Sequence, residues 1–286
     1  MDNKQLPIGV FDSGVGGLTV YRALHDRLPN EHFVYLGDTA RVPYGTKSLS
    51  TVERYAIENS EFLASRGIKM LVVACNTASA LALPRVRERI GMDVVGVIGP
   101  GGRKAVEVTR GLESPRIGVI ATEATVASNA YYAAIRRVSP EVEVLQVGCP
   151  LFVPLAEEGW TNEPETASIA GKYLSEMKKF APHALVLGCT HYPILREVIQ
   201  LTIGENVTLI DSGEATAEEV ERLLNERDLA NPNGVAGERS LCDDMDHFYV
   251  TDAAERFAHV AERFLGSKPA KLEAVEVYGH DSFITP

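Results

Sequence analysis

Cysteine is scarce in this chain, and its spacing argues against two common uses of the residue. The 286 residues include four cysteines, at positions 75, 149, 189 and 242. Small disulfide-stabilised domains carry many closely spaced cysteines, so these wide spacings do not indicate a disulfide framework. No Cys-x-x-Cys pair occurs, which makes a redox protein a weak interpretation.

Long apolar runs and excess positive charge are also lacking. No stretch approaches the roughly 18 apolar residues of a membrane-spanning helix. Residues 1–5 lead directly into an apolar run with no signal-like segment, so a cytoplasmic protein is expected. The formal net charge of -11 and a pI near 5.2 disfavour a nucleic-acid or membrane-surface binder. An anionic small-molecule substrate is still compatible with this charge, because a few local donors can outweigh it.

What the chain does contain is a regular alternation of apolar runs and helical patterns. Its 45% hydrophobic content is normal for a globular protein, and its length suits one large domain or two ordinary ones. Strands that alternate with helices indicate the α/β class with mostly parallel sheets. The expected strands are residues 8–11, 33–36, the run ending at Cys75, 94–98, 116–122, 142–145, 184–187, 207–210, 247–251 and 272–277.

Glycine and proline predict where the helices between these strands end. A helix over residues 50–66 should stop at Gly67, and the helix after Cys75 should be interrupted or bent at Pro84. Residues 99–102, Gly-Pro-Gly-Gly, are expected to form a break. Further helices are expected from 211 to about 227 and over 253–265, with a polar loop over 228–246.

The two halves of the chain share a weak repeat. Ile-Gly-Val occurs at 8–10 and again at 117–119, an offset of 109, while Cys75 and Cys189 differ by 114. Both offsets lie near 110 residues and connect segments with the same strand–loop–helix pattern. We therefore expect two structurally related halves.

Cys75 and Cys189 occupy equivalent places in this repeat. Each ends an apolar, β-branched run and is followed by hydroxyl or amide side chains, a pattern typical of a strand followed by a helix start. Open α/β sheets place their chemistry in such loops. Alone, a cysteine is often a small buried hydrophobe. As a pair, the two suggest a redox couple, a zinc site with His191, or an acid–base pair whose pKa values are lowered by helix N-termini.

Three other residues near these loops are candidates for chemistry. Asp12 precedes a glycine-rich turn over 13–17, but Thr19 occupies the third glycine position of a dinucleotide fingerprint, so carboxylate binding by backbone N–H groups fits better. Asp12 itself is either a strand-end cap or a carboxylate that binds an ammonium or assists Cys75. His191 is either a helix cap or a proton partner for Cys189. From the residues alone, Glu157 is interpreted as part of a solvated helix turn.

Five motifs together resemble the glutamate racemases of the cofactor-independent aspartate/glutamate racemase family. They cover nearly the whole chain in order: residues 8–14 (IGVFDSG), 37–39 (GDT) with 43–45 (PYG), 74–78 (ACNTA), 96–98 (GVI) and 188–193 (GCTHYP). The resemblance implies two pseudo-symmetric α/β domains, each a mostly parallel sheet flanked by helices, with the active site in the cleft between them. It places residues 1–98 and 209–286 in the first domain and 99–208 in the second.

The resemblance also implies an activity and a set of residues. It implies interconversion of L- and D-glutamate, supplying D-glutamate for peptidoglycan, without pyridoxal phosphate or a metal, in a cytoplasmic homodimer. The family pattern implies that Cys75 and Cys189 exchange the Cα proton, assisted by Asp12, His191 and Glu157. The positions that match substrate-binding residues are Asp12, Ser13, Tyr44, Gly45, Asn76, Thr77, Thr190 and His191. The alternatives are a racemase of aspartate or another acidic amino acid, and a two-lobed amino-acid binding protein.

Overall fold

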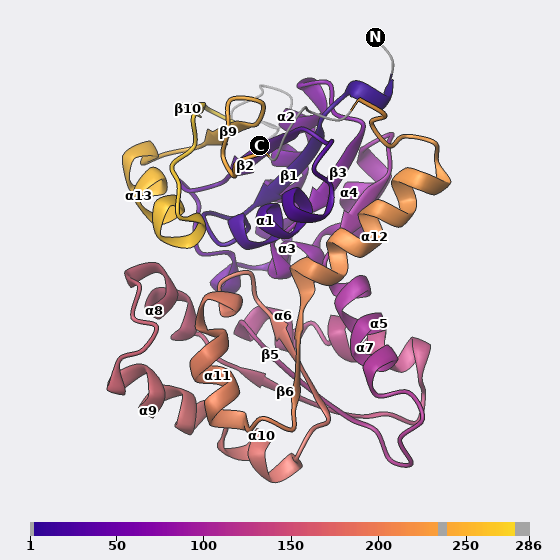
Figure 1. The fold of residues 1–286 in the computed structure, drawn as a ribbon, viewed down its shortest axis with the longest axis vertical. Coiled ribbons are helices and arrows are strands. Elements are labelled where there is room, and N and C mark those ends of the chain that lie inside the picture. Colours follow the sequence, from indigo (N-terminus) through magenta and orange to yellow (C-terminus); the bar gives the residue numbers. More distant parts are fainter. Residues whose placement is uncertain (1–2, 234–238, 278–286) are drawn as a thin grey trace.

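The computed structural model describes residues 3–233 and 239–277. It contains two sheets in which every strand pair is parallel. Figure 1 shows the two sheets in separate parts of the molecule, which we call the first lobe (six-stranded sheet) and the second lobe (four-stranded sheet). The expected α/β class with two mostly parallel sheets is confirmed.

The strands and helices have the following bounds. The strands are β1 Ile8–Asp12, β2 Phe33–Gly37, β3 Met70–Val73, β4 Val94–Gly96, β5 Arg116–Ala121, β6 Glu143–Gly148, β7 Ala184–Gly188, β8 Thr208–Asp211, β9 His247–Val250 and β10 Leu272–Ala274. The α-helices are α1 Leu18–Arg27, α2 Leu49–Ser65, α3 Asn76–Leu81, α4 Leu83–Arg89, α5 Ile98–Val108, α6 Glu123–Ala127, α7 Ala130–Val138, α8 Phe152–Glu158, α9 Pro164–Tyr173, α10 Ser175–Phe180, α11 Arg196–Ile203, α12 Ser212–Glu226 and α13 Ala254–Leu265. Short 3-10 helices are η1 Asn3–Gln5, η2 Tyr44–Thr46 and η3 Tyr192–Leu195.

Corresponding strand orders confirm the repeat. The first sheet runs β10-β9-β2-β1-β3-β4 and the second β6-β5-β7-β8, so β1 to β4 correspond in order to β5 to β8. In each sheet the first strand of the repeat has its successor on one side and the third strand on the other. Loops beyond the carboxyl ends of such strands diverge and leave a crevice. Asp12 and Cys75 lie at this place in the first lobe, and Cys189 lies there in the second.

Both faces of the first sheet are covered, which explains its continuous apolar strands. Val10 and Val72 pack with α1 and α13, whereas Phe11 and Val73 pack with α2 and α4 on the other face. Successive residues of a strand point to opposite faces, so each strand contributes to both clusters. The cluster around Val10 continues into the second lobe, where it includes residues of β7 and α11. The two lobes are therefore joined by hydrophobic packing.

The chain passes between the lobes twice. It leaves the first sheet after β4 through α5, which packs on α7 and β7 in the second lobe. It returns after β8 through α12, which packs on α1 and α5 and runs from the middle to the upper right of Figure 1. The predicted boundary at residue 209 falls inside β8, which pairs with β7. The return to the first lobe therefore follows residue 211.

One sequence-based prediction was wrong at the first crossing. Residues 99–102 do not break the structure but form the first turn of α5, and β4 ends at Gly96 rather than at residue 98. Proline fits in a first helical turn because its missing N–H would have no partner inside the helix. The glycines allow close packing: a Cβ on Gly101 would lie 3.3 Å from Ser212 Cβ, and one on Gly102 would lie 3.2 Å from Ala134 Cβ.

Other predicted boundaries agree with the structure to within a few residues. α2 ends at Ser65 and Gly67 has a φ of +73°, as expected for a glycine that ends a helix. The helix after Cys75 is interrupted at Ala82, and Pro84 lies in the first turn of α4. β10 ends at Ala274, before the expected residue 277. Within the described residues, no helix is both long and apolar enough to cross a membrane.

Candidate active site

Cys75 lies between β3 and α3, where its thiol caps the helix. The Sγ atom accepts a hydrogen bond from the Ala78 N–H at 3.5 Å and donates one to Ser13 Oγ at 3.4 Å. Burial raises the pKa of the Cys75 thiol to about 12, and the Asp12 carboxylate and Cys189 add to this effect. The expected lowering of this pKa by the helix N-terminus is therefore wrong for the site as it stands. Burial outweighs a helix of six residues.

Asp12 forms the end of β1 beside Cys75. Its Oδ2 accepts a hydrogen bond from the Gly14 N–H at 2.9 Å, whereas the buried Oδ1 has no hydrogen-bond partner among the described residues. Burial raises the pKa of Asp12, and the charge of His191 acts against this effect. A buried acceptor without a partner is costly, so Asp12 Oδ1 is well suited to receive a donor from a ligand.

Cys189 follows β7 in the second lobe, and its neighbour is His191. Cys189 Sγ lies 3.8 Å from His191 Nδ1, and His191 Nε2 lies 3.1 Å from Glu157 Oε1. Burial acts to lower the pKa of His191, but hydrogen bonds to Cys189 and Glu157 outweigh it and raise the pKa to about 10. His191 is therefore an imidazolium at neutral pH, placed between the Cys189 sulfur and the Glu157 carboxylate.

Glu157 belongs to this group, whereas Glu158 is exposed to solvent. The hydrogen bond from His191 lowers the pKa of Glu157 despite partial burial. Arg256 Nη2 lies 3.5 Å from Glu157 Oε2, and Arg263 donates to the Glu157 main-chain oxygen. Both arginines come from α13 of the first lobe. Glu157 lies in the last turn of α8, as the residues alone indicated, but its side chain is paired with His191 and is not a solvated one.

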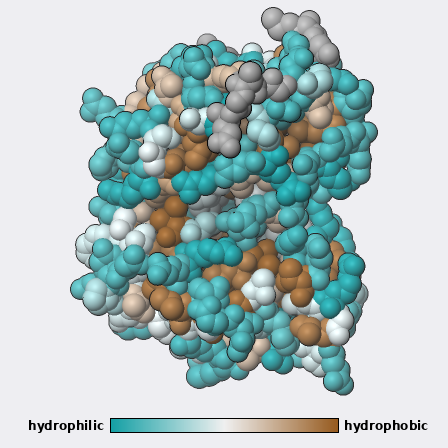
Figure 2. Space-filling view, viewed as in Figure 1, coloured by the Kyte–Doolittle hydropathy of each residue, from teal (hydrophilic) through white to brown (hydrophobic). Residues whose placement is uncertain are grey.

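The Asp12 loop and the Cys189 loop touch each other across the boundary between the lobes. A Cβ added to Gly16 would lie 2.3 Å from Thr190 Oγ1 and 2.4 Å from His191 Cε1. Thr19 Oγ1 donates to the Thr190 main-chain oxygen at 2.8 Å. Figure 2 shows a hollow where the two lobes meet. The structure thus brings the residues that follow β1 and β3 together with those that follow β7.

Polar side chains from both lobes extend this site around α3. Asn76 Oδ1 accepts a hydrogen bond from Tyr131 at 2.7 Å, and its buried Nδ2 has no hydrogen-bond partner within the part of the chain that the structure describes. Thr77 Oγ1 lies 3.0 Å from Thr122 Oγ1 and 3.3 Å from Thr125 Oγ1. The sequence analysis missed Thr122, Thr125 and Tyr131. The internal repeat could have indicated Thr122, because Thr122 directly follows β5 just as Ser13 directly follows the equivalent strand β1.

Tyr44 and Gly45 lie at the edge of this region in different ways. The Tyr44 side chain is buried, and its hydroxyl donates to Asp38 and accepts from Asn59 Nδ2 at 3.0 Å. This hydroxyl is therefore occupied inside the first lobe, and the main chain is what Tyr44 offers to a ligand. A Cβ on Gly45 would lie 3.2 Å from Thr122 Cβ, so Gly45 faces the second lobe.

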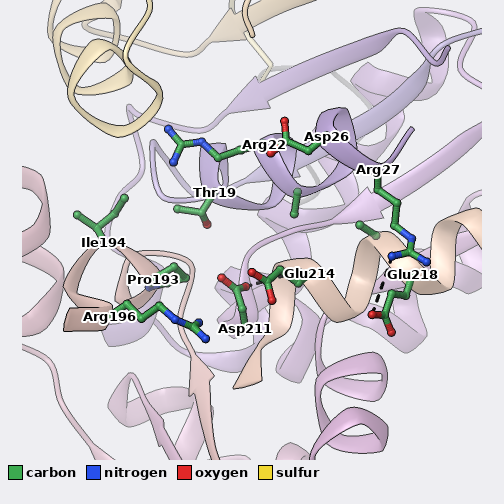
Figure 3. Close-up of a pocket in the computed structure, with 12 residues that line it drawn as sticks. Thr19, Arg22, Asp26, Arg27, Pro193, Ile194, Arg196, Asp211, Glu214 and Glu218 are labelled. Carbon is green, nitrogen blue, oxygen red and sulfur yellow. Dashed lines mark hydrogen bonds and ion pairs between the residues drawn. The ribbon is translucent and has the colours of Figure 1, made fainter. Parts of the chain in front are cut away.

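Among the residues described, no group of three or more histidine, cysteine, aspartate or glutamate side chains is arranged to hold a metal ion. A pocket of about 560 Å³ lies between α1, α12 and the start of α11 (Figure 3). None of its lining residues belongs to the predicted site, and several of its charges are paired, as in Arg27 with Glu218 at 4.0 Å.

The raised pKa of His191 predicts a pH dependence of stability. Its value of about 10 in the fold exceeds the ordinary value of 6.5, so the stabilisation is complete below about pH 6.5 and is lost as pH rises through about 10. We expect the difference in free energy of unfolding between the unchanged chain and His191→Gln to shrink over this range in urea titrations. In a Glu157→Gln background this stabilisation should be lost at lower pH, because Glu157 helps to raise the pKa of His191. A difference that is constant from pH 6 to 10 would contradict the assignment.

Comparisons with known proteins agree with this arrangement. Residues 8–220 match the model of the Asp/Glu/Hydantoin racemase family. The chain is 52% identical to a glutamate racemase of Geobacter metallireducens over 261 residues, covering 91% of this chain and 93% of that protein. A glutamate racemase isoform from Bacillus anthracis superposes with a TM-score of 0.88 at 36% identity, covering 96% of this chain and 98% of that one. A Francisella tularensis glutamate racemase in complex with D-glutamate has a TM-score of 0.86 at 38% identity, covering 98% and 100%. The resemblance seen in the motifs is confirmed: the chain belongs to the Asp/Glu/hydantoin racemase family.

Proposed function

We propose that the chain is an isomerase that interconverts L- and D-glutamate by passing the Cα proton between Cys75 and Cys189. The observation that carries this proposal is the placement of the two thiols at equivalent strand ends of the two lobes, close enough that Cys189 raises the pKa of Cys75. Relatives named glutamate racemase, at 52% and 45% identity over most of the chain, support glutamate as the substrate.

In the proposed reaction, one cysteine is a thiolate and the other a thiol when glutamate binds. The thiolate takes the Cα proton and becomes a thiol, leaving a carbanion. The opposite thiol then donates its proton to the other face of Cα and becomes the thiolate. The reverse reaction uses the same groups in exchanged roles. No pyridoxal phosphate or metal takes part in this scheme.

The neighbours of each cysteine suit these two states. Asp12 lies beside Cys75, and the His191 imidazolium lies beside Cys189. An ammonium group bound at Asp12 Oδ1 would place positive charge near Cys75 and lower its pKa, because an opposite charge favours the thiolate. Substrate binding would thus counteract the burial that raises the pKa of Cys75.

The remaining polar groups suit the two carboxylates of glutamate. Asn76 Nδ2 is a buried donor without a hydrogen-bond partner in residues 3–233 and 239–277. We assign the carboxylates to Asn76, to the main chain at Tyr44 and Gly45, and to the hydroxyls of Ser13, Thr77, Thr122, Thr125 and Thr190. Donors fixed in a water-excluded site stabilise developing charge more strongly than water does. The carbanion would be stabilised in the same way.

Several wider features belong to the same proposal. The proposed domains are residues 1–98 with 209–286 and residues 99–208. Because β8 pairs with β7, residues 209–211 pair with the sheet of the second domain, and the chain returns to the first domain after them. The protein would act in the cytoplasm as a homodimer and supply D-glutamate for peptidoglycan. Sheet membership supports the discontinuous first domain, because β1 to β4 pair in one sheet with β9 and β10.

Circular dichroism of purified, chelator-treated protein with glutamate tests the function. We expect the signal of either enantiomer to decay to zero without added pyridoxal phosphate, while aspartate, as the matched control, stays unchanged. Decay with aspartate alone would favour the aspartate racemase alternative. Binding of glutamate without any decay would contradict racemisation and favour a two-lobed binding protein.

A further inference from the structure

Tyr131 connects the two cysteine loops, although it belongs to neither. It lies on α7 in the second lobe and is fully buried. Its hydroxyl donates a 2.7 Å hydrogen bond to Oδ1 of Asn76, the residue that follows Cys75. Its ring packs on the backbone that precedes Cys189, since a Cβ on Gly188 would lie 3.0 Å from Tyr131 Cε2. One side chain thus touches the neighbours of both thiols.

The hydrogen bond determines which end of the Asn76 amide faces the site. An asparagine amide has an acceptor oxygen on one side and a donor NH2 on the other. Because Tyr131 occupies the oxygen, the NH2 group is left pointing away from Tyr131, buried and without a hydrogen-bond partner among the described residues. A carboxylate can accept hydrogen bonds but cannot donate them, so only this orientation binds it. With the amide reversed, the oxygen would repel the carboxylate.

Tyr131 is itself held in place. A Cβ on Gly101 would lie 3.4 Å from its Cε1, so the ring sits between α5 and the Gly188 backbone. Ser212, the first residue of α12, lies beside the Tyr131 ring and hydroxyl, and its own hydroxyl donates to the Leu187 main-chain oxygen at 3.2 Å. Burial raises the pKa of Tyr131, so the phenol keeps its proton and stays a donor throughout the neutral range. The contacts come from both helices through which the chain passes between the lobes.

We propose that Tyr131 is a positioning residue, whose hydroxyl orients the Asn76 amide so that it donates to a substrate carboxylate. This inference rests on the proposed function in one respect: that the bound carboxylate belongs to glutamate. Tyr131 does not contact the reacting atoms, and it acts through Asn76.

Tyr131→Phe tests the proposal, because it removes the hydroxyl and keeps the ring. Its matched control is Tyr132→Phe, the next residue, which is 41% exposed. Binding is measured by calorimetry with an equimolar mixture of L- and D-glutamate, so turnover does not change the ligand during titration. We expect Tyr131→Phe to weaken binding and raise KM by about 10-fold, with kcat changed less, and Tyr132→Phe to match the unchanged protein.

A double-mutant cycle with Asn76→Ala separates positioning from a general structural role. If Tyr131 acts through Asn76, Tyr131→Phe should cause little further loss of glutamate binding once the amide is gone. An equal loss in both backgrounds, or no loss in the single variant, would overturn the proposal. Binding without turnover by the unchanged protein would refute the racemase function alone. No binding by the unchanged protein would refute both.

Discussion

Replacing Cys75 or Cys189 with alanine is expected to lower kcat/KM for glutamate by about 10³-fold or more in both directions. In the proposed mechanism each thiol serves as base in one direction and as acid in the other, so the loss of either one stops the reaction in both directions. The enantiomers have equal free energies in solution, so kcat/KM must fall equally for L- and D-glutamate. The measurement is the initial rate of decay of the circular dichroism signal for each enantiomer.

Cys242→Ala provides the matched control for these variants. Cys242 is also buried, but its thiol is grouped with Tyr21 and Ser267 rather than with the site. We expect its racemase activity to stay within about 2-fold of the unchanged protein, because only contacts made in the transition state change the rate. Calorimetric binding of glutamate by Cys75→Ala and Cys189→Ala would show that both still fold. Substantial turnover by either variant would refute the two-thiol scheme.

Lys69→Met is expected to cost about 3–5 kcal/mol of the free energy of unfolding. Lys69 Nζ lies 2.5 Å from Glu31 Oε2, and the two side chains are 1% and 3% exposed. Lys69 also donates to the main-chain oxygens of Lys4 and Leu229 at 2.7 and 2.9 Å. Methionine can fill much of the lysine volume but would leave the Glu31 charge buried without its counter-ion. Guanidinium titration followed by circular dichroism measures the loss.

The matched control is Lys179→Met, which breaks an exposed ion pair. Lys179 Nζ lies 2.7 Å from Glu176 Oε1, and the side chains are 74% and 67% exposed. Exposed pairs contribute little, so we expect a change below about 1 kcal/mol. The double variant Glu31→Leu with Lys69→Met should recover part of the loss, because it removes both charges. Equal stability of the two single lysine variants would show that burial adds nothing at Lys69.

Family motifs and local pattern predict most of the residues that the structure brings together where the two lobes meet. Cys75 and Cys189 each end an apolar run, and this pattern predicted both strands and the loops that carry the thiols. Pattern analysis failed at residues 99–102, where proline and glycine indicated a break but form the first turn of α5. Glycine there serves close packing against Ser212 and Ala134, which a local rule cannot detect.

Other features depend on residues that are far apart in the chain. Glu157 was interpreted from the residues alone as a solvated turn, yet it holds His191, which lies 34 positions away. Thr122 and Thr125 meet Thr77 only because the second lobe packs on α3. Tyr44 matched a substrate-binding position, but its hydroxyl is taken by Asp38 and Asn59. Each outcome depends on which surfaces are brought together, and sequence periodicity contains no such information.

The sequence by itself determined the α/β class, the repeat, the family and the two thiols, because periodicity, turn residues and motifs are properties of short segments. Only the tertiary structure decided the burial of Cys75 and the orientation of the groups around both thiols. The pKa of Cys75 rises because packing removes it from water beside Asp12, and that of His191 rises because Cys189 and Glu157 lie on either side. Desolvation and pairing depend on three-dimensional neighbours, so the chemistry of the site was set by the contact of the two lobes.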